Sequence, residues 1–303
     1  MDVSLIVATV DRVDQTRRLF DSLSRQDFPG RFEVIVVDQN PDDRLVELVA
    51  TYGRQFPIRH LRQAQRLLAR ARNAGLARAS GDLIGFPDDD CVYEPTTLRG
   101  VAAFFRDHPD QAGVIGNVLA LDGDDTVMLL GAPPGPGPVD PALAWEVGMT
   151  AAFFIRAAAA RGLRYDERMG PGTWWGCGED VDFLLRGMDR GTRVYYEPGI
   201  IVRHPRPLDT YTTMQLVRRY FSYGRGTGYL MGKRRFPLTT VVGSVLEPIV
   251  KLGWFVRQRR WKDLPSLPVA SVGRLIGYLG YWTGALARPR GDANTNPNGS
   301  PGD

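Results

Sequence analysis

Three consecutive aspartates, Asp88 to Asp90, follow a short apolar stretch between Leu83 and Phe86. Adjacent carboxylates repel one another and are costly to bury without a counter-charge. One interpretation is a solvated turn, because proline and aspartate are common turn residues. The other is a site for Mn²⁺ or Mg²⁺, in which the ion is the counter-charge and holds a substrate diphosphate. Side chains alternate on an extended segment, so Asp89 is expected to point away from its two neighbours.

The aspartates stand in a regular alternation of predicted strands and helices over the first 120 residues. Apolar runs predict strands at 4–10, 32–38, 57–61, 82–86 and 112–120, and helical spacing predicts helices at 12–26, 42–53, 64–79 and 95–107. This alternation predicts an α/β fold with a mostly parallel sheet that helices flank on both faces. Thr9, Asp38 and the aspartates follow separate strands. We expect them to converge, because ligands bind at the carboxyl ends of such strands.

A second acidic pair, Glu179 and Asp180, opens a predicted helix. Carboxylates favour the positive end of the helix dipole whatever the function, so a structural interpretation stays open. The preceding Trp174 and Trp175 offer flat faces for a sugar ring or a lipid, or they fill the core. Between the two acidic motifs, residues 122–140 are predicted to form a loop, because they are rich in proline and glycine. Ordered structure is predicted to return at 148–156, 164–191, 192–198 and 200–205, with a last core strand before His204.

The two cysteines, Cys91 and Cys177, are too few for a disulfide framework, which favours a reducing compartment. We expect both to be small buried side chains. The N-terminus carries no basic segment before its apolar run and is predicted to be a first strand rather than a signal peptide. A cytoplasmic protein is the expectation.

The net charge of +4 conceals a strong asymmetry between the two parts of the chain. Residues 203–303 contain 16 Lys and Arg against 5 Asp and Glu, a net charge of +11, which leaves −7 for residues 1–202. Two apolar segments, Leu238–Val256 and Leu264–Ala287, lie in the basic part. Charged residues interrupt both, and a charge at mid-membrane costs about 2.5–3.5 kcal/mol. We therefore predict segments that lie in the interface of an anionic membrane, with a membrane span or ordinary helical packing as alternatives.

Five segments resemble, in order and spacing, the family 2 glycosyltransferases of the GT-A fold. They are SLIVATVDR (4–12), VIVVDQN (34–40), ARNAGLARASGDLIGFPDDDC (71–91), GCGEDVDFLLR (176–186) and IIVRHP (200–205). The resemblance implies a Rossmann-like GT-A catalytic domain at residues 1–205. A basic, apolar helical region at 206–287 and a disordered polar tail at 288–303 are expected to follow.

The resemblance also implies roles for individual residues. It places the metal ion on Asp90 and His204, and it makes Asp180, beside Glu179, the catalytic base. The residues that it places at the nucleotide-sugar donor are Thr9, Arg12, Asp38, Arg72, Asn73, Asp88 and Asp89. Structural alternatives stay open for three of these residues: a helix cap or turn for Asp38, a solvated arginine for Arg72, and a structural histidine for His204.

The predicted function is metal-dependent, inverting transfer of a sugar from a UDP, GDP or dTDP donor to a hydroxyl of a glycan or lipid-linked acceptor. The predicted location is the inner face of the plasma membrane. One alternative is a sugar nucleotidyltransferase, but its glycine-rich phosphate loop is missing after the first strand. Another is a nucleic-acid binder, which the pI near 9.2 suggests; the interleaving of basic and apolar residues argues against it. A third is a family member that binds the donor without transferring the sugar. The presence of all four family aspartates argues against it: Asp38, Asp88, Asp90 and Asp180.

Overall fold

The computed structural model of the chain describes residues 1–123, 125–129, 132–133, 135–206 and 211–284. The chain divides into two compact units, which are described separately. The first unit contains residues 1–166 and 179–206, and the second contains residues 167–178 and the chain after residue 206. Residues 167–178 thus differ from the sequence-based prediction, which placed them in the first domain. They join the second unit because Trp175 stacks on Tyr229 there, with 4.5 Å between ring centroids. The predicted tail at 288–303 lies outside the described residues.

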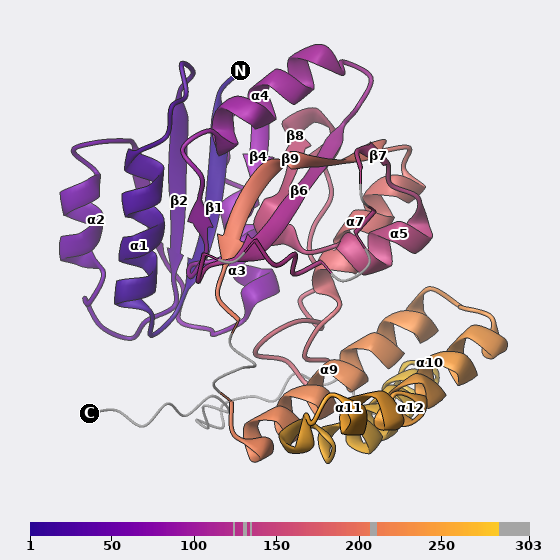
Figure 1. Cartoon of the computed structure of the whole chain (residues 1–303). Helices are drawn as coiled ribbons and strands as arrows, with labels where there is room; N and C mark the ends of the chain where they lie inside the picture. The colour runs from indigo at the N-terminus through magenta and orange to yellow at the C-terminus, as the bar shows by residue number, and fades with distance from the viewer. Residues whose placement is uncertain (124, 130–131, 134, 207–210, 285–303) are drawn as a thin grey trace. The chain divides into compact units, whose positions relative to one another are not determined.

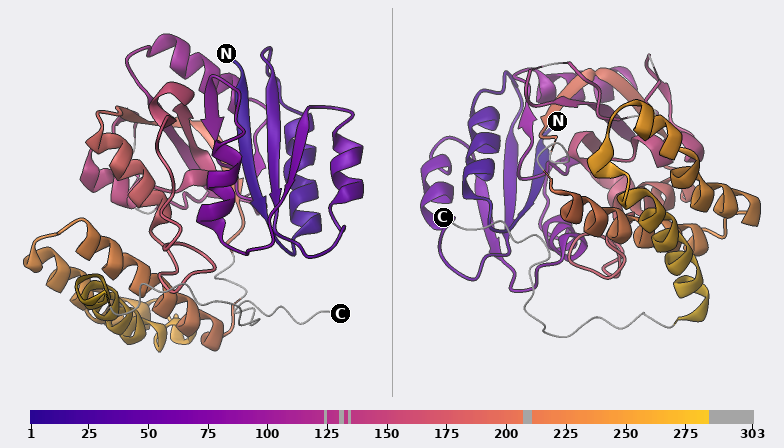
Figure 2. Two further views of the ribbon diagram at one scale, coloured as in Figure 1. Left: turned by 180° about the vertical axis from the view of Figure 1, so that it is seen from behind. Right: turned by 60° about the horizontal axis from the view of Figure 1, so that its bottom comes forward.

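The first part of the sheet in the first unit is parallel, as the sequence predicts. Its strands lie in the order β3-β2-β1-β4, and α3 contacts β1 and β2. Helices α1 and α2 lie on one side of these strands and α3 on the other (Figures 1 and 2), as right-handed crossovers require when the strand order reverses after β3. The elements are β1 (Val3–Thr9), α1 (Val13–Ser24), β2 (Phe32–Asp38), α2 (Val46–Tyr52), β3 (Ile58–Arg62), α3 (Leu68–Leu76) and β4 (Leu83–Gly85).

The rest of the sheet is mixed. Strand β8 runs antiparallel to both β4 and β6, whereas β9 is parallel to β6 and antiparallel to the short strands β5 and β7. The elements are β5 (Val92–Tyr93), α4 (Thr97–Asp107), β6 (Gly113–Ala120), β7 (Gly137–Pro138), α5 (Pro141–Val147), η1 (Thr150–Ala152), β8 (Phe153–Arg156), α6 (Ala157–Ala160), α7 (Glu179–Asp189) and β9 (Val194–His204). The ordered segments predicted at 192–198 and 200–205 are therefore joined in one strand, β9, whose pairing with β6 shifts register between Gly116 and Asn117.

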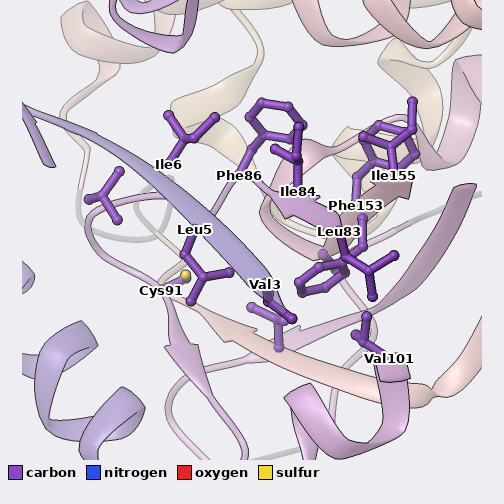
Figure 3. Close-up of a cluster of buried hydrophobic side chains, with 14 of the residues drawn as sticks. Val3, Leu5, Ile6, Leu83, Ile84, Phe86, Cys91, Val101, Phe153 and Ile155 are labelled. Carbon is purple, nitrogen blue, oxygen red and sulfur yellow. The ribbon is translucent and has the colours of Figure 1, made fainter. Parts of the chain in front are cut away.

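The core of the first unit forms because its central strands are apolar on both faces. Val34 to Val37 of β2 and Leu5 to Val7 of β1 are fully buried. Figure 3 shows the side chains of β1 and β4 packed with Phe153 and Ile155 of β8. Such strands are typical of a sheet covered on both sides by helices. Polar side chains stand at the edge of this buried sheet.

Strand register decides which polar residues meet at that edge. Thr9 pairs with Asp38, and Asp38 pairs with Arg62, so the carboxyl ends of three strands lie side by side. Farther along the sheet, Val92 of β5 pairs with Arg203 of β9. This antiparallel pairing brings the aspartates that precede β5 next to His204 at the end of β9. The sheet thus brings together residues that are more than 100 positions apart in sequence.

The second unit is mostly helical between residues 211 and 284, whereas its other described segment, 167–178, forms turns and a β-bridge between Met169 and Trp175. Its helices are α9 (Thr213–Lys233), α10 (Leu238–Val250), α11 (Leu252–Arg257), η2 (Trp261–Asp263) and α12 (Ser266–Thr283). Helices α9 and α12 approach closely through glycines: a Cβ added at Gly228 would stand 1.9 Å from the Arg274 carbonyl oxygen, and one at Gly277 would stand 2.0 Å from that of Arg225. The predicted segment Leu238–Val256 corresponds to α10 and α11, which meet at Lys251. The segment Leu264–Ala287 corresponds to α12, apart from its last residues, which are not described.

Candidate active site

Two aspartates and a histidine form a compact cluster in the first unit. One ligand atom each from Asp88, Asp90 and His204 lies within 4.8 Å of the other two. His204 Nε2 is 3.3 Å from Asp90 Oδ1 and 3.7 Å from Asp88 Oδ2. Asp90 Oδ1 is buried and makes no well-aligned hydrogen bond to any described residue. The cluster therefore presents two carboxylates and an imidazole nitrogen to one point.

The orientation of His204 suits a metal ligand. Its Nδ1 lies 2.7 Å from the Pro205 carbonyl oxygen, to which it donates a hydrogen bond. Metal-binding histidines are commonly held in this way, because the bond fixes the ring and directs the other nitrogen at the ion. Carboxylate oxygens and an imidazole nitrogen are ligands that Mn²⁺ accepts, and carboxylates also suit Mg²⁺. The residues present therefore fit the divalent ion that the sequence predicts.

Arg12 provides positive charge on the other side of the three aspartates. Its Nη1 lies 2.8 Å from Asp89 Oδ1 and 2.8 Å from Asp90 Oδ2. Asp89 is buried and is not part of the cluster with His204, as the alternation of an extended segment predicts. Burial raises the pKa of Asp89 to about 6 even though the charge of Arg12 opposes that shift. Arg12 is thus a counter-charge that the protein itself supplies.

Arg72 is almost completely buried and connects the two acidic motifs. Its Nη2 donates a hydrogen bond of 2.9 Å to Asp88 Oδ1, and its Nη1 donates one to Asp180 Oδ1. Glu179 Oε1 lies 3.8 Å from the same Nη1. The guanidinium also lies 5.4 Å from the centre of the Tyr165 ring. A single cation therefore fixes the distance between the aspartate at the predicted donor site and the predicted base.

Asp180 stands in the first turn of α7 with both carboxylate oxygens oriented. One accepts the bond from Arg72, and the other accepts a hydrogen bond of 2.9 Å from the Thr150 hydroxyl. Burial raises the pKa of Asp180, although the charge of Arg72 acts against this shift. Burial raises the pKa of the neighbouring Glu179 as well, and the charge of Asp180 adds to that rise. Asp180 is thus held in one orientation, whereas Glu179 is driven toward its neutral form.

Asp38 anchors a second polar group at the ends of β2 and β3. Its Oδ1 accepts hydrogen bonds from the backbone and side-chain nitrogens of Asn40, at 2.9 and 2.7 Å. Its Oδ2 lies 2.8 Å from His60 Nε2 and 3.3 Å from Arg62 Nη1. A cavity of about 400 Å³ opens beside this group. It is lined by Gln39, Asn40, Pro41, Asp43, Arg62, Gln63, Ala64 and Arg66. A flat polar ligand such as a nucleobase fits a cavity of this size and lining.

Residues 4–138 match the family described as glycosyl transferase family 2. This segment is a glycosyltransferase family 2 domain. Among curated relatives, poly(ribitol-phosphate) β-N-acetylglucosaminyltransferase TarS of Staphylococcus aureus is 32% identical over 111 residues. That match covers 36% of this chain and 19% of TarS, so the chain aligns with about a fifth of that relative's length.

Solved structures support the GT-A fold for the domain and for its mixed sheet. The crystal structure of S. aureus TarS 1–349 with UDP-GlcNAc has a TM-score of 0.56 at 19% identity, and the match covers 94% of this chain and 92% of that one. A mannosyltransferase from Pyrobaculum calidifontis in complex with GDP-Man and Mn²⁺ has a TM-score of 0.61 at 16% identity. It covers 90% of this chain and 86% of that one. At these identities the likeness establishes the fold.

Two of the residues predicted for donor binding serve the scaffold in this structure. Asn73 accepts a hydrogen bond of 2.7 Å from the Tyr165 backbone nitrogen and donates one of 3.0 Å to the Tyr165 carbonyl. The Thr9 hydroxyl is buried, 3.1 Å from that of Thr16. Both residues hold elements of the first unit in place, and their contact with a donor stays a prediction. Trp175 is buried in the second unit, which favours the core alternative for that residue.

Several residues of the site escaped the sequence-based prediction. His60 and Arg62 lie on β3, one strand away from Asp38, and the pairing of Asp38 with Arg62 is the signal that could have indicated them. Thr150 and Tyr165 carry no such signal, because they lie outside the segments that resemble the family. Cys91 is buried, as expected, whereas Cys177 is partly exposed, with its Sγ 3.1 Å from the Tyr223 carbonyl oxygen.

The charge of His204 makes the stability of the metal-free chain depend on pH. Burial by itself would lower the pKa of His204, but the close contact with the Asp90 carboxylate and the charges of Asp88 and Asp90 raise it from 6.5 to about 9. The protonated ring therefore stabilises the fold fully below the unfolded pKa of 6.5, and this contribution disappears as the pH rises through about 9.

We expect His204→Gln to lower the free energy of unfolding most at pH 6. This difference from the wild type should be smaller at pH 10, by up to about 3 kcal/mol. Urea unfolding of both proteins with a chelator present measures the difference. A loss of unfolding free energy that is the same at both pH values would contradict the ion pairs of His204 with Asp88 and Asp90.

Proposed function

We propose that the chain is a metal-dependent, inverting glycosyltransferase. In this proposal it moves a sugar from a nucleoside diphosphate to a hydroxyl group of a glycan or lipid-linked acceptor. The observation that carries the proposal is the convergence of the Asp88, Asp90 and His204 cluster with the Arg72–Asp180 pair in the first unit, which contains the family 2 segment at residues 4–138. UDP-GlcNAc and GDP-Man, which the two structural neighbours bind, are the first donors to consider.

The donor would bind across the carboxyl edge of the sheet. Its base and ribose fit the cavity beside Asp38, where Asn40 and Arg62 offer polar contacts. Asp88, Asp90 and His204 would hold Mn²⁺ or Mg²⁺, which when bound neutralises charge on the diphosphate. Arg12 and Arg72 hold the aspartates in place through their ion pairs. The sugar would then lie between Asp88 and the α7 motif, because Arg72 joins these two.

Asp180 would act as the general base. The acceptor oxygen forms a bond to the anomeric carbon while the bond from that carbon to the diphosphate oxygen breaks. The hydroxyl proton passes to the Asp180 carboxylate, and the nucleoside diphosphate leaves with the electron pair. Burial raises the pKa of Asp180, which strengthens it as a proton acceptor, and Thr150 and Arg72 fix its position. Direct displacement inverts the configuration at the anomeric carbon.

The test is equilibrium binding of UDP-, GDP- and dTDP-sugars to the full chain by calorimetry, with Mn²⁺, with Mg²⁺ and with a chelator. We expect one class of donor to bind with the metal and to lose at least about tenfold in affinity with the chelator or in Asp90→Asn. Asp110→Asn is the matched control, because Asp110 is an exposed aspartate paired with Arg193. If no donor binds in a metal-dependent way, the proposal fails.

A further inference from the structure

One face of α10 is a continuous stripe of aliphatic side chains that the second unit leaves exposed. The five residues are Leu238, Val242, Leu246, Ile249 and Val250, which are 65%, 48%, 49%, 45% and 78% exposed. Spacings of three and four residues place them on one side of the helix. Val241 and Pro248, on the other side, are buried. One side of α10 therefore packs inside the second unit, whereas the side exposed to solvent is apolar instead of polar.

A second stripe runs along α12. Its residues are Val272, Leu275, Leu279 and Trp282, each about half exposed at 53%, 47%, 51% and 53%. The buried side of α12 carries small residues, among them Gly273 and Gly277, which pack against α9. The contact between α10 and α12 is made by other residues: Arg274 Nη1 donates to the Ser244 carbonyl oxygen and lies 2.7 Å from Glu247 Oε2. That contact leaves both stripes open. Apolar rows of this extent mark an interaction surface.

The charge around the stripes identifies the partner. Residues 211–284 contain 12 Lys and Arg against two Asp and Glu. Both acidic residues are paired, Glu247 with Lys251 and Arg274, and Asp263 with Arg260. The described surface of this unit is therefore strongly basic as well as apolar. Apolar stripes on a unit with this excess of basic residues complement an anionic lipid bilayer, which offers acyl chains below a layer of phosphates.

The ion pairs on α10 favour a helix that lies on the membrane over one that crosses it. Residues Leu238–Arg257 are long and apolar enough to span a bilayer by length and composition, and 17% of that window is buried. However, Glu247 and Lys251 lie near the middle of the segment, and Arg274 ties α10 to α12 there. A span would bring these charges to the bilayer centre, at about 2.5–3.5 kcal/mol each. An interfacial helix keeps them in water.

We propose that the α10 and α12 stripes dock the chain peripherally on an anionic bilayer. The aliphatic side chains enter the acyl boundary, Trp282 lies at headgroup depth, and the surrounding Lys and Arg contact lipid phosphates. The cytoplasmic leaflet of a plasma membrane carries such a surface charge. This inference concerns the second unit alone and does not depend on glycosyl transfer.

The test is flotation of the full chain with vesicles of phosphatidylcholine alone and of phosphatidylcholine mixed with phosphatidylglycerol. We expect flotation with the anionic vesicles, weaker flotation with the neutral ones, and weakening by salt. Leu246→Glu and Leu275→Glu, one on each stripe, should each lower the partition coefficient by about tenfold or more, and Arg257→Gln by about fivefold at low salt. Val46→Glu, on exposed Val46 of α2 in the first unit, is the matched control and should change nothing.

Circular dichroism and donor binding, measured on the same preparations, show that the variants are folded. Three results would overturn the inference. The first is equal, weak flotation with both vesicle types that the stripe variants do not change. The second is a dimer in sedimentation equilibrium that the stripe variants dissociate, which would assign the stripes to a second copy of the chain. The third is resistance to extraction at alkaline pH, which would indicate a membrane span.

Discussion

Replacing Asp180 with asparagine is expected to lower kcat by about 10²–10⁴-fold and to leave the Kd of the donor within a few-fold of its original value. Asparagine keeps the shape of the side chain, its Oδ1 can still accept from Arg72 and its amide nitrogen can donate to the Thr150 hydroxyl, but it cannot take up the acceptor's proton. The donor contacts lie elsewhere in the proposed site, on Asp38, Asp88 and the metal cluster. Transfer rates from saturating donor, together with donor binding by calorimetry, separate the two effects.

Glu179→Gln is the matched control, one position earlier on the same helix. Burial and the charge of Asp180 raise the pKa of Glu179, so its folded side chain is largely neutral near pH 7 and glutamine imitates it. We expect this variant to keep its kcat within about tenfold of the wild type. The assignment of the base would be reversed if Glu179→Gln abolished transfer while Asp180→Asn retained it.

The largest effect on stability is expected from Arg72→Met. The substitution leaves Asp88, Asp180 and Glu179 without the buried cation that they share. Removing one partner of a buried ion pair costs about 3–5 kcal/mol, because an uncompensated charge remains. We expect a loss of that size in the free energy of unfolding at pH 8, measured with urea. Arg70→Met, on the exposed side of α3, should cost less than about 1 kcal/mol.

The penalty of Arg72→Met should shrink as the pH falls. Burial already raises the pKa of Asp180 and Glu179, and removing Arg72 raises both further above their unfolded values. The folded variant therefore takes up protons as the pH falls, and its stability recovers relative to the wild type. Unfolding at pH 5.5 and pH 8 tests this sign. A penalty below about 1 kcal/mol, or one that grows on acidification, would contradict the role of Arg72 as the shared counter-charge.

The positions of Asp38 and of the three aspartates could be predicted from sequence because they follow apolar strands. A parallel sheet aligns the ends of such strands, so strand prediction alone places these carboxylates at one edge. His204 also follows an apolar strand, and the antiparallel pairing of β5 with β9 brings it next to the three aspartates. The mixed part of the sheet could not be predicted from local patterns, because the insertion of β8 between β4 and β6 depends on long-range pairing.

Local sequence does not show which positive groups neutralise Asp88 to Asp90. The sequence predicts a metal ion in that role, and the cluster with His204 fits one. The structure adds Arg12 and Arg72, which reach the aspartates from two different helical segments. The bond from Arg72 to Asp180 joins residues 108 positions apart. Local sequence leaves Arg72 as one of several arginines on a helix; the family resemblance places it near the donor, and its burial in the structure excludes the solvated alternative.

The most direct measurement of the central claim is a crystal structure of the full chain with Mn²⁺ and the donor that binds it. Data collected at the manganese absorption edge locate the ion independently of any assumption about the site. The account predicts one anomalous peak within coordination distance of Asp90 and His204. The donor diphosphate should lie next to this ion, and the sugar should face Asp180. An ion or diphosphate bound away from this cluster would contradict it.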